Sequence, residues 1–110
     1  MKRSTEFNAT VKHGVRAVQP DIVVHALRAA DDEGPRIGLV VAKSVGTSVQ
    51  RHRVARRLRH AAREVVDQLD PSDRVVIRAL PSSREAISAG LRKQLQVALR
   101  KAHFLNGAGQ

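Results

Sequence analysis

The sequence predicts an α/β domain in which a helix, two or three strands, a second helix, a further strand and a last helix follow one another. Apolar residues recur at helical spacing in three stretches, and short runs of β-branched residues lie between them. Hydrophobic residues make up 42% of the chain, which is enough to form a core. A chain of 110 residues suits one modest core, so we expect a single domain over residues 1–110.

Residues 4–13 are expected to form the first helix, which Gly14 ends. Phe7 and Val11 are four residues apart, so their side chains share one face. This spacing favours a core position for Phe7 over an exposed ring that contacts a nucleotide.

Two stretches rich in β-formers follow at 15–19 and 22–27, with a turn between them. His25 interrupts the second stretch, and a lone histidine in a strand is more often a surface residue than a ligand. The acidic turn at 31–35 carries no spaced ligand pattern, so it is expected to be a solvated loop.

Residues 36–43 predict a second long strand, and their nearly continuous apolar run favours a central position in the sheet. Residues 75–77 form a further buried strand, which is reached through a helix and therefore joins the sheet parallel to a neighbour. A last helix is expected to open at 81–83, with Ser82 and Glu85 as a capping box. Its apolar face would contain Ile87, Leu91, Leu95, Leu99 and Ala102.

The stretch at 43–63 is strongly basic and contains no acid. Gly46 permits a tight turn, after which Thr47 can cap a helix and Gln50 can complete a capping box. The helix is expected to run to about residue 69. Its apolar stripe would consist of Val54, Leu58, Ala61, Ala62, Val65 and Leu69.

The basic residues of this helix fall mostly on the side opposite the apolar stripe. These are His52, Arg53, Arg56, Arg59, His60 and Arg63. Arg57 lies between the apolar stripe and the basic side. Arg51 lies near the stripe, but in the first turn, where its side chain can extend beyond the end of the helix. Because acids that usually intersperse a solvated face are missing, the ridge favours a polyanionic partner. Arginine suits phosphate well, since its planar fork donates two parallel hydrogen bonds.

Charge and composition narrow the class of function. The net charge of +10 and the pI of about 11.6 indicate nucleic acid or an acidic membrane surface. No stretch approaches the roughly 20 apolar residues of a membrane span, and no signal peptide is visible. The absence of cysteine excludes disulfides and cysteine-based zinc sites and agrees with a cytoplasmic location.

The sequence predicts neither catalytic nor metal-ligating residues. Its ten acids form no convincing pair, its five histidines are scattered, and no nucleophile or phosphate-loop motif is present. Phe7 and Phe104 are the only aromatic residues, so a sheet that stacks bases on several rings cannot be built. Binding should therefore rest on phosphate contacts and shape.

The central motif resembles the signature of the bacterial ribonuclease P protein subunit, and of its actinobacterial branch most closely. The motif consists of Lys43-Ser44-Val45-Gly46, Val49, Arg51-His52-Arg53, Arg56, Leu58 and Arg59. Further likeness lies in Glu6-Phe7, Lys12-His13-Gly14, Arg36-Ile37-Gly38-Leu39-Val40-Val41 and Asp73-Arg74-Val75-Val76-Ile77-Arg78-Ala79. The resemblance therefore covers nearly the whole chain.

The resemblance implies a two-layer α/β (α+β) sandwich around a four-stranded mixed sheet, with a left-handed strand-helix-strand crossover. It also implies an accessory subunit of an endoribonuclease, which assists a catalytic RNA in removing the 5′ leader of precursor tRNA. Hydrolysis would belong to the RNA and its bound Mg2+, and no protein partner is expected.

Carried over by position, the basic motif would contact the catalytic RNA, whereas a cleft beside the first helix would receive the single-stranded leader. The RNA-binding set is Lys43, Arg51, His52, Arg53, Arg56 and Arg59, to which the helical pattern adds Arg57 and Arg63. The leader cleft would be lined by Phe7, Val11 and His25. The family often has aromatic residues at the last two positions, so stacking should be weaker here and electrostatics more important.

Two other classes of protein fit part of the sequence. A different RNA-binding module, such as a ribosomal or double-strand-RNA-binding protein, would share the charge. The double-strand-RNA-binding module would also share the early helix–strands–helix order. It would lack the basic motif after a strand and the further strand and helix beyond it. A nuclease that cuts unaided would cleave RNA with magnesium and no RNA subunit.

Overall fold

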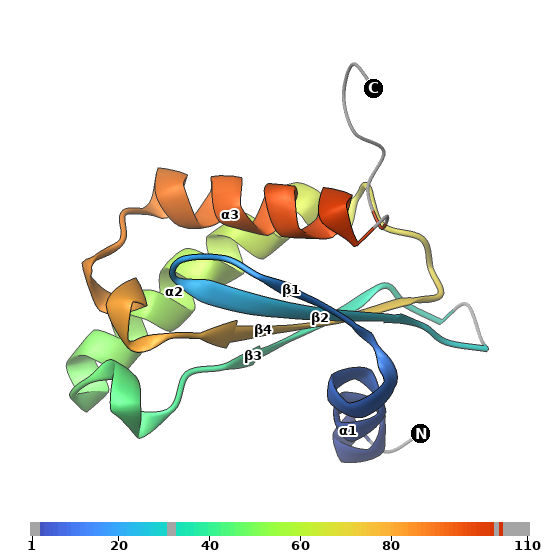
Figure 1. The fold of residues 1–110 in the computed structure, drawn as a ribbon, viewed down its shortest axis with the longest axis horizontal. Coiled ribbons are helices and arrows are strands. Elements are labelled where there is room, and N and C mark those ends of the chain that lie inside the picture. Colours follow the sequence, from blue (N-terminus) through green and yellow to red (C-terminus); the bar gives the residue numbers. More distant parts are fainter. Residues whose placement is uncertain (1–2, 31–32, 103, 105–110) are drawn as a thin grey trace.

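A computed structural model describes residues 3–30, 33–102 and 104 of the chain. Three α-helices, two 3-10 turns and four strands follow one another in these residues (Figure 1). They are α1 (Arg3–His13), β1 (Val15–Val18), β2 (Ile22–Arg28), β3 (Arg36–Val40), η1 (Lys43–Val45), α2 (Ser48–Val66), β4 (Asp73–Ala79), η2 (Pro81–Glu85) and α3 (Ser88–Lys101). The predicted order of elements is confirmed, while the acidic residues 31–32 of the predicted loop and the tail at 105–110 lie outside the described part.

The four strands form one mixed sheet in the order β1-β2-β4-β3. β1 and β4 each pair antiparallel with β2, and β3 pairs parallel with β4. Helices α2 and α3 lie on one face of this sheet and α1 lies on the other (Figure 1). The four-stranded mixed sheet is thus confirmed, as is the parallel pairing of the two strands joined by α2. The left hand of that crossover stays a prediction.

The main core lies between the sheet and the pair α2 and α3. Strand residues alternate between the two faces, so every second residue of β2 and β4 enters this core. The largest fully buried side chains in it include Ile22, Leu58, Ile77, Leu91, Leu95 and Leu99. The stripe predicted for α2 is confirmed at Val54, Leu58, Ala61 and Val65, which are all buried. Ala62 is only half-buried, and Leu69 is buried beyond the helix, which ends at Val66 and not near residue 69.

β3 is an edge strand, and the prediction of a long central strand at 36–43 is wrong. The strand covers Arg36–Val40 and pairs with β4 alone among the described strands, and the turn η1 begins at Lys43. The two central positions belong to β2 and β4.

The apolar run of β3 reflects contacts on both of its faces. Ile37 and Leu39 pack against the main core. On the other face, a Cβ atom placed on Gly38 would lie 3.4 Å from the Phe7 ring. A strand that is covered on both faces has the composition of a central strand even when one edge is unpaired, because burial sets composition.

Helix α2 begins at the predicted capping box. The Thr47 side chain accepts a hydrogen bond from the Gln50 backbone N–H at 3.2 Å, and the Gln50 side chain accepts one from the Thr47 N–H at 2.9 Å. Gly46 precedes the cap with φ of 152°, a conformation that strongly favours glycine. A side chain at this position would also collide with Gln50. The local sequence therefore determines where the basic helix starts.

The predicted start of the last helix is wrong. Residues Pro81–Glu85 form the separate turn η2, and α3 begins only at Ser88. Instead of capping a helix, the Ser82 hydroxyl donates to the Asp21 carboxylate at 2.6 Å in the turn between β1 and β2. Ile87 precedes α3 and is 71% exposed, so it does not belong to the apolar face.

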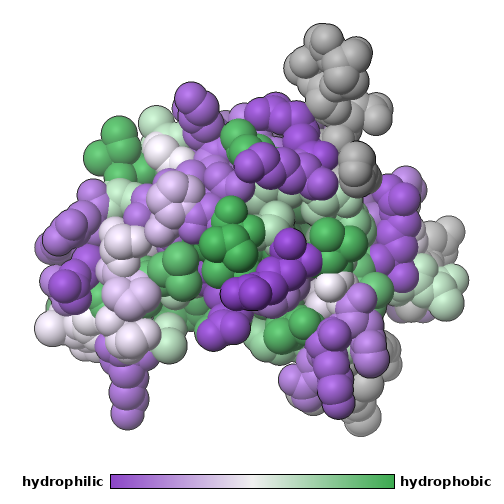
Figure 2. Space-filling view, viewed as in Figure 1, coloured by the Kyte–Doolittle hydropathy of each residue, from purple (hydrophilic) through white to green (hydrophobic). Residues whose placement is uncertain are grey.

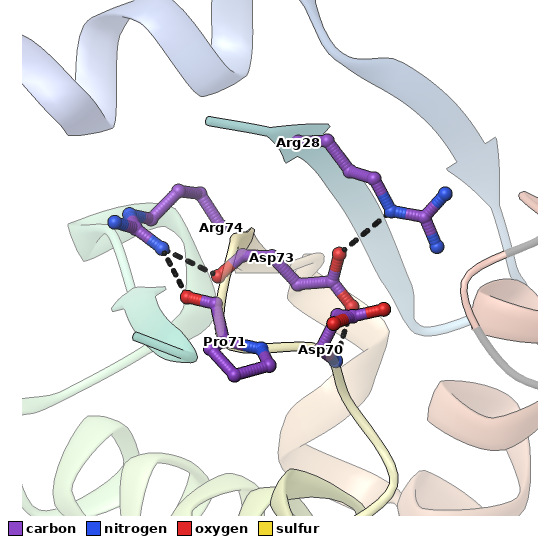
Figure 3. A network of polar contacts seen from close by, with 5 residues as sticks. All are labelled: Arg28, Asp70, Pro71, Asp73 and Arg74. Carbon is purple, nitrogen blue, oxygen red and sulfur yellow. Dashed lines mark hydrogen bonds and ion pairs between the residues drawn. The ribbon is translucent and has the colours of Figure 1, made fainter. Parts of the chain in front are cut away.

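A buried carboxylate fixes the start of β4. Asp73 is fully buried and accepts hydrogen bonds from Arg28 Nε at 3.1 Å and from the Asp70 backbone N–H at 2.8 Å (Figure 3). The guanidinium of Arg28 also lies 5.1 Å from the ring centroid of Phe104. Arg74 NH1, beside it, donates to the carbonyl of Pro71 at 3.1 Å. This network joins the ends of β2, β4 and the last described residue.

Candidate nucleic-acid interface

The outer side of α2 carries the exposed arginines that the sequence predicts there. We call Arg53, Arg56, Arg59 and Arg63 the arginine ridge; all four are exposed, as are His52, His60 and Lys43 of η1. The helix is anchored through its opposite, buried side, so these side chains point to solvent. No acid stands among residues 43–63, and the next residue, Glu64, turns to α3 and pairs with Arg92 at 3.3 Å. The ridge therefore presents a nearly uncompensated positive charge.

Two arginines of the predicted RNA-binding set are less exposed than the residues of the arginine ridge. Arg57 is half-buried, and its NH1 donates to the Ala86 carbonyl between η2 and α3 at 2.9 Å. Arg51 is also half-buried, and its Nε is buried without a hydrogen-bond partner. Both residues thus contribute to packing, whereas the ridge residues are free to contact a ligand.

A second candidate surface lies on the other face of the sheet, beside α1. A cavity of about 450 Å³ opens between α1, β3 and β4. It is lined by Phe7, Thr10, Arg36, Ile37, Gly38, Leu39, Arg74, Val75 and Val76. Phe7 is half-buried, so its ring both contacts the sheet and remains accessible from the cavity. The prediction of a purely core position for this ring is therefore only half right.

The cavity does not bring together the three residues assigned to the leader cleft. Phe7 lines it, whereas Val11 and His25 are not among its lining residues. His25 is nevertheless close by, because it pairs across the sheet with Val76, which does line the cavity. Val11 is half-buried on α1.

His25 is a buried residue, and the surface position predicted for it is wrong. Its side chain is 3% exposed, and neither ring nitrogen has a hydrogen-bond partner. Burial, followed by the charges of Arg78 and Arg16, lowers the pKa of His25 below its usual value of 6.5. The sequence pattern missed this because His25 stands on the sheet face that α1 covers, opposite the face of Val24 and Ala26.

The strands add basic residues that lie outside the predicted RNA-binding set. Arg16 pairs with His25 in the β1–β2 register, and Arg78 pairs with Val23 in the β2–β4 register. Both are exposed on the face where α1 lies. Arg36 and Arg74, which line the cavity, also belong to this face and have partners within the protein. Because side chains alternate between the two faces of a strand, this group could have been recognised once it was known which residues of β4 enter the main core.

The surface is mixed rather than uniformly charged. Figure 2 shows hydrophilic side chains over α3 and hydrophobic residues at the surface near β1. Val15 and Val18 of β1 are 50% and 56% exposed. Within the described residues, no helix is long and apolar enough to cross a membrane. No group of three or more metal-ligating side chains comes together there either.

Comparison with known proteins identifies one family for this chain. The family model of ribonuclease P matches residues 1–103. A ribonuclease P protein component of Mycobacterium ulcerans is 62% identical over 111 residues, covering 98% of this chain and 92% of that protein. One from Mycobacterium avium is 67% identical over 105 residues, covering 92% of this chain and 88% of that protein.

Solved structures show the same fold at lower identity. The ribonuclease P protein of Staphylococcus aureus superimposes with a TM-score of 0.83 at 19% identity and covers 96% of both chains. That of Thermotoga maritima superimposes with a TM-score of 0.77 at 18% identity and covers 97% of both chains.

The fold and the basic helix define an α+β RNA-binding protein with a mixed four-stranded sheet. The chain belongs to the ribonuclease P protein family. Proteins of this family are accessory subunits of an endoribonuclease in tRNA processing, so an RNA partner in the holoenzyme follows. The family match excludes the ribosomal and double-strand-RNA-binding alternatives.

Proposed function

We propose that the arginine ridge of α2 binds the catalytic RNA of the holoenzyme, with the chain acting as one RNA-binding domain over residues 1–110. The observation that carries the proposal is the exposed row of arginines without an acid between residues 43 and 63. Guanidinium groups donate paired hydrogen bonds to phosphate oxygens, and each neutralised phosphate releases counterions. Lys43 and His52 extend the ridge at the start of the helix. Arg51 and Arg57 act mainly by holding that helix in place.

We infer that the face beside α1 receives the single-stranded 5′ leader of precursor tRNA. The cavity offers one ring, that of Phe7, on which a base can stack. Arg16 and Arg78 are exposed on the same side of the sheet and can contact the leader backbone. Val11 has no ring and the ring of His25 is buried, so neither residue offers a stacking surface comparable to that of Phe7. Leader affinity should therefore depend strongly on salt and weakly on base identity.

In this proposal the chemistry belongs to the RNA. We infer that the holoenzyme requires Mg2+ and that the RNA holds most of it. The protein supplies affinity for both RNA partners through separate surfaces on α2 and beside α1. A cytoplasmic location fits this role in tRNA maturation.

The deciding experiment is cleavage of precursor tRNA at low Mg2+, with the cognate catalytic RNA alone, the protein alone, and both together. Cleavage at the mature 5′ end only when both are present is the expected result. Cleavage by the protein alone would place the reaction on its side chains. Tight RNA binding without stimulation would reduce the chain to a passive RNA-binding domain.

A further inference from the structure

A groove between α2 and α3 lies on the side of the sheet opposite the cavity beside α1. Its volume is about 570 Å³. It is lined by Arg53, Arg56, Arg57, His60, Ala61 and Glu64 from α2, and by Ser88 and Arg92 from α3. Arg53 and Arg56 also belong to the arginine ridge, so the groove continues that surface towards α3.

The charge inside the groove is unbalanced. Four guanidinium groups line it, and Glu64 supplies the single carboxylate. Arg92 NH1 donates to both carboxylate oxygens of Glu64 at 3.3 Å. Arg57 is held by the Ala86 carbonyl through one nitrogen only, which leaves its other N–H donors available. The groove therefore has the composition of an anion site that is partly occupied by a carboxylate of the protein itself.

The ion pair between Glu64 and Arg92 can be broken at little cost in stability. The side chains are 49% and 45% exposed, so the pair contributes little to stability. A phosphodiester group also presents two negatively charged oxygens, and an arginine fork can donate two hydrogen bonds to them as it can to a carboxylate. Binding of a phosphate would replace the Glu64–Arg92 ion pair by a phosphate–Arg92 pair. The phosphate would also offset the positive charge of the other arginines in the groove.

We propose that this groove binds the phosphodiester backbone of the catalytic RNA, with Arg92 as a contact residue and Glu64 as a competitor for it. The proposal rests on the proposed function and extends the RNA-binding surface from α2 onto α3. It assigns opposite effects to two substitutions in one ion pair, which a purely structural role of the pair would not produce.

The test measures the dissociation constant of the full-length protein for the cognate catalytic RNA at several salt concentrations. Arg92→Ala should weaken binding about tenfold and reduce the salt slope by about one. Glu64→Gln should tighten binding about threefold, because it frees Arg92 and removes a negative charge beside the phosphate. Lys93→Ala is the matched control: it removes one exposed cation of α3 that does not line the groove.

Equal losses for Arg92→Ala and Lys93→Ala, or weaker binding by Glu64→Gln, would overturn the proposal. Thermal melting of each variant shows that the fold is retained, as the exposure of all three residues predicts. The proposed function fails separately, if the unmodified protein neither binds the RNA nor stimulates precursor cleavage. Wild-type stimulation combined with an unaffected Arg92→Ala variant would reject the groove alone.

Discussion

At the scale of single residues, His25 shows how burial changes the role of a side chain. It is almost fully covered, its ring nitrogens have no hydrogen-bond partner, and Arg16 and Arg78 are near. Each of these conditions disfavours the imidazolium ion. The folded protein therefore holds His25 neutral at pH values where the unfolded chain is already protonated.

The pKa of His25 makes folding stability depend on pH. Because the folded-state pKa lies below 6.5, the unfolded state binds more protons as pH falls through 6.5. The free energy of unfolding should decrease from pH 7.5 towards pH 5, and a His25→Leu variant should show a weaker decrease. Urea denaturation at a series of pH values measures this difference. His52→Gln, at an exposed position, should keep the wild-type pH dependence, and an identical slope in the His25 variant would contradict the prediction.

Asp73 is a second residue whose importance comes from burial. Asp73→Ala would leave the Asp70 N–H and the Arg28 guanidinium without their acceptor. A loss of about 2 to 3 kcal/mol in the free energy of unfolding is expected, because a buried polar network is broken. Asp67→Ala, at the exposed end of α2, should cost under about 0.5 kcal/mol. Chemical denaturation of both variants makes the comparison, and similar losses would show that the network contributes little.

At the scale of elements, α2 carries its buried apolar residues on one side and the exposed arginine ridge, proposed to bind RNA, on the other. The exposed ridge residues Arg53 and Arg56 have no role in the core, so changing both to Ala should weaken RNA binding and leave the melting temperature nearly unchanged. Arg57→Ala should instead cost about 1 kcal/mol of stability, because it removes the hydrogen bond to the Ala86 carbonyl. RNA titration and thermal melting of both variants test this division. A large stability loss in the double variant would mean that its arginines stabilise the helix.

The elements also keep the two proposed RNA-binding surfaces, the arginine ridge and the cavity beside α1, apart from each other. α2 and α1 lie on opposite faces of one sheet, and residues of β3 pack against the elements on both faces. Two RNA segments can therefore be bound without competing for the same surface. The sheet between them fixes their relative positions.

At the scale of the whole molecule, the net charge of +10 predicts an affinity for RNA that depends strongly on salt concentration. If about six cations contact phosphates, the logarithm of the association constant should fall with the logarithm of salt concentration with a slope of roughly −4 to −5. Filter binding or fluorescence titration with the catalytic RNA between low and moderate salt gives this slope. A value near zero would contradict an interface built on arginine and phosphate.

Local sequence determined much of this protein without help from the fold. Thr47 and Gln50 close a capping box through short-range hydrogen bonds, so the start of α2 was predictable. The phase of Val54, Leu58 and Val65 then decides which side of the helix is buried, and the four arginines of the ridge occupy the other. The candidate RNA-binding ridge follows from these two local facts.

Tertiary structure alone decided the rest, because the deciding contacts join residues far apart in the chain. Ser82 donates to Asp21 instead of capping a helix, which moves the start of α3 to Ser88. His25 is buried because α1 covers that face of the sheet, and β3 is an edge strand although both its faces are covered. Capping and helical phase act over one or two turns and can be recognised in sequence, whereas strand order and face coverage depend on which distant segments meet.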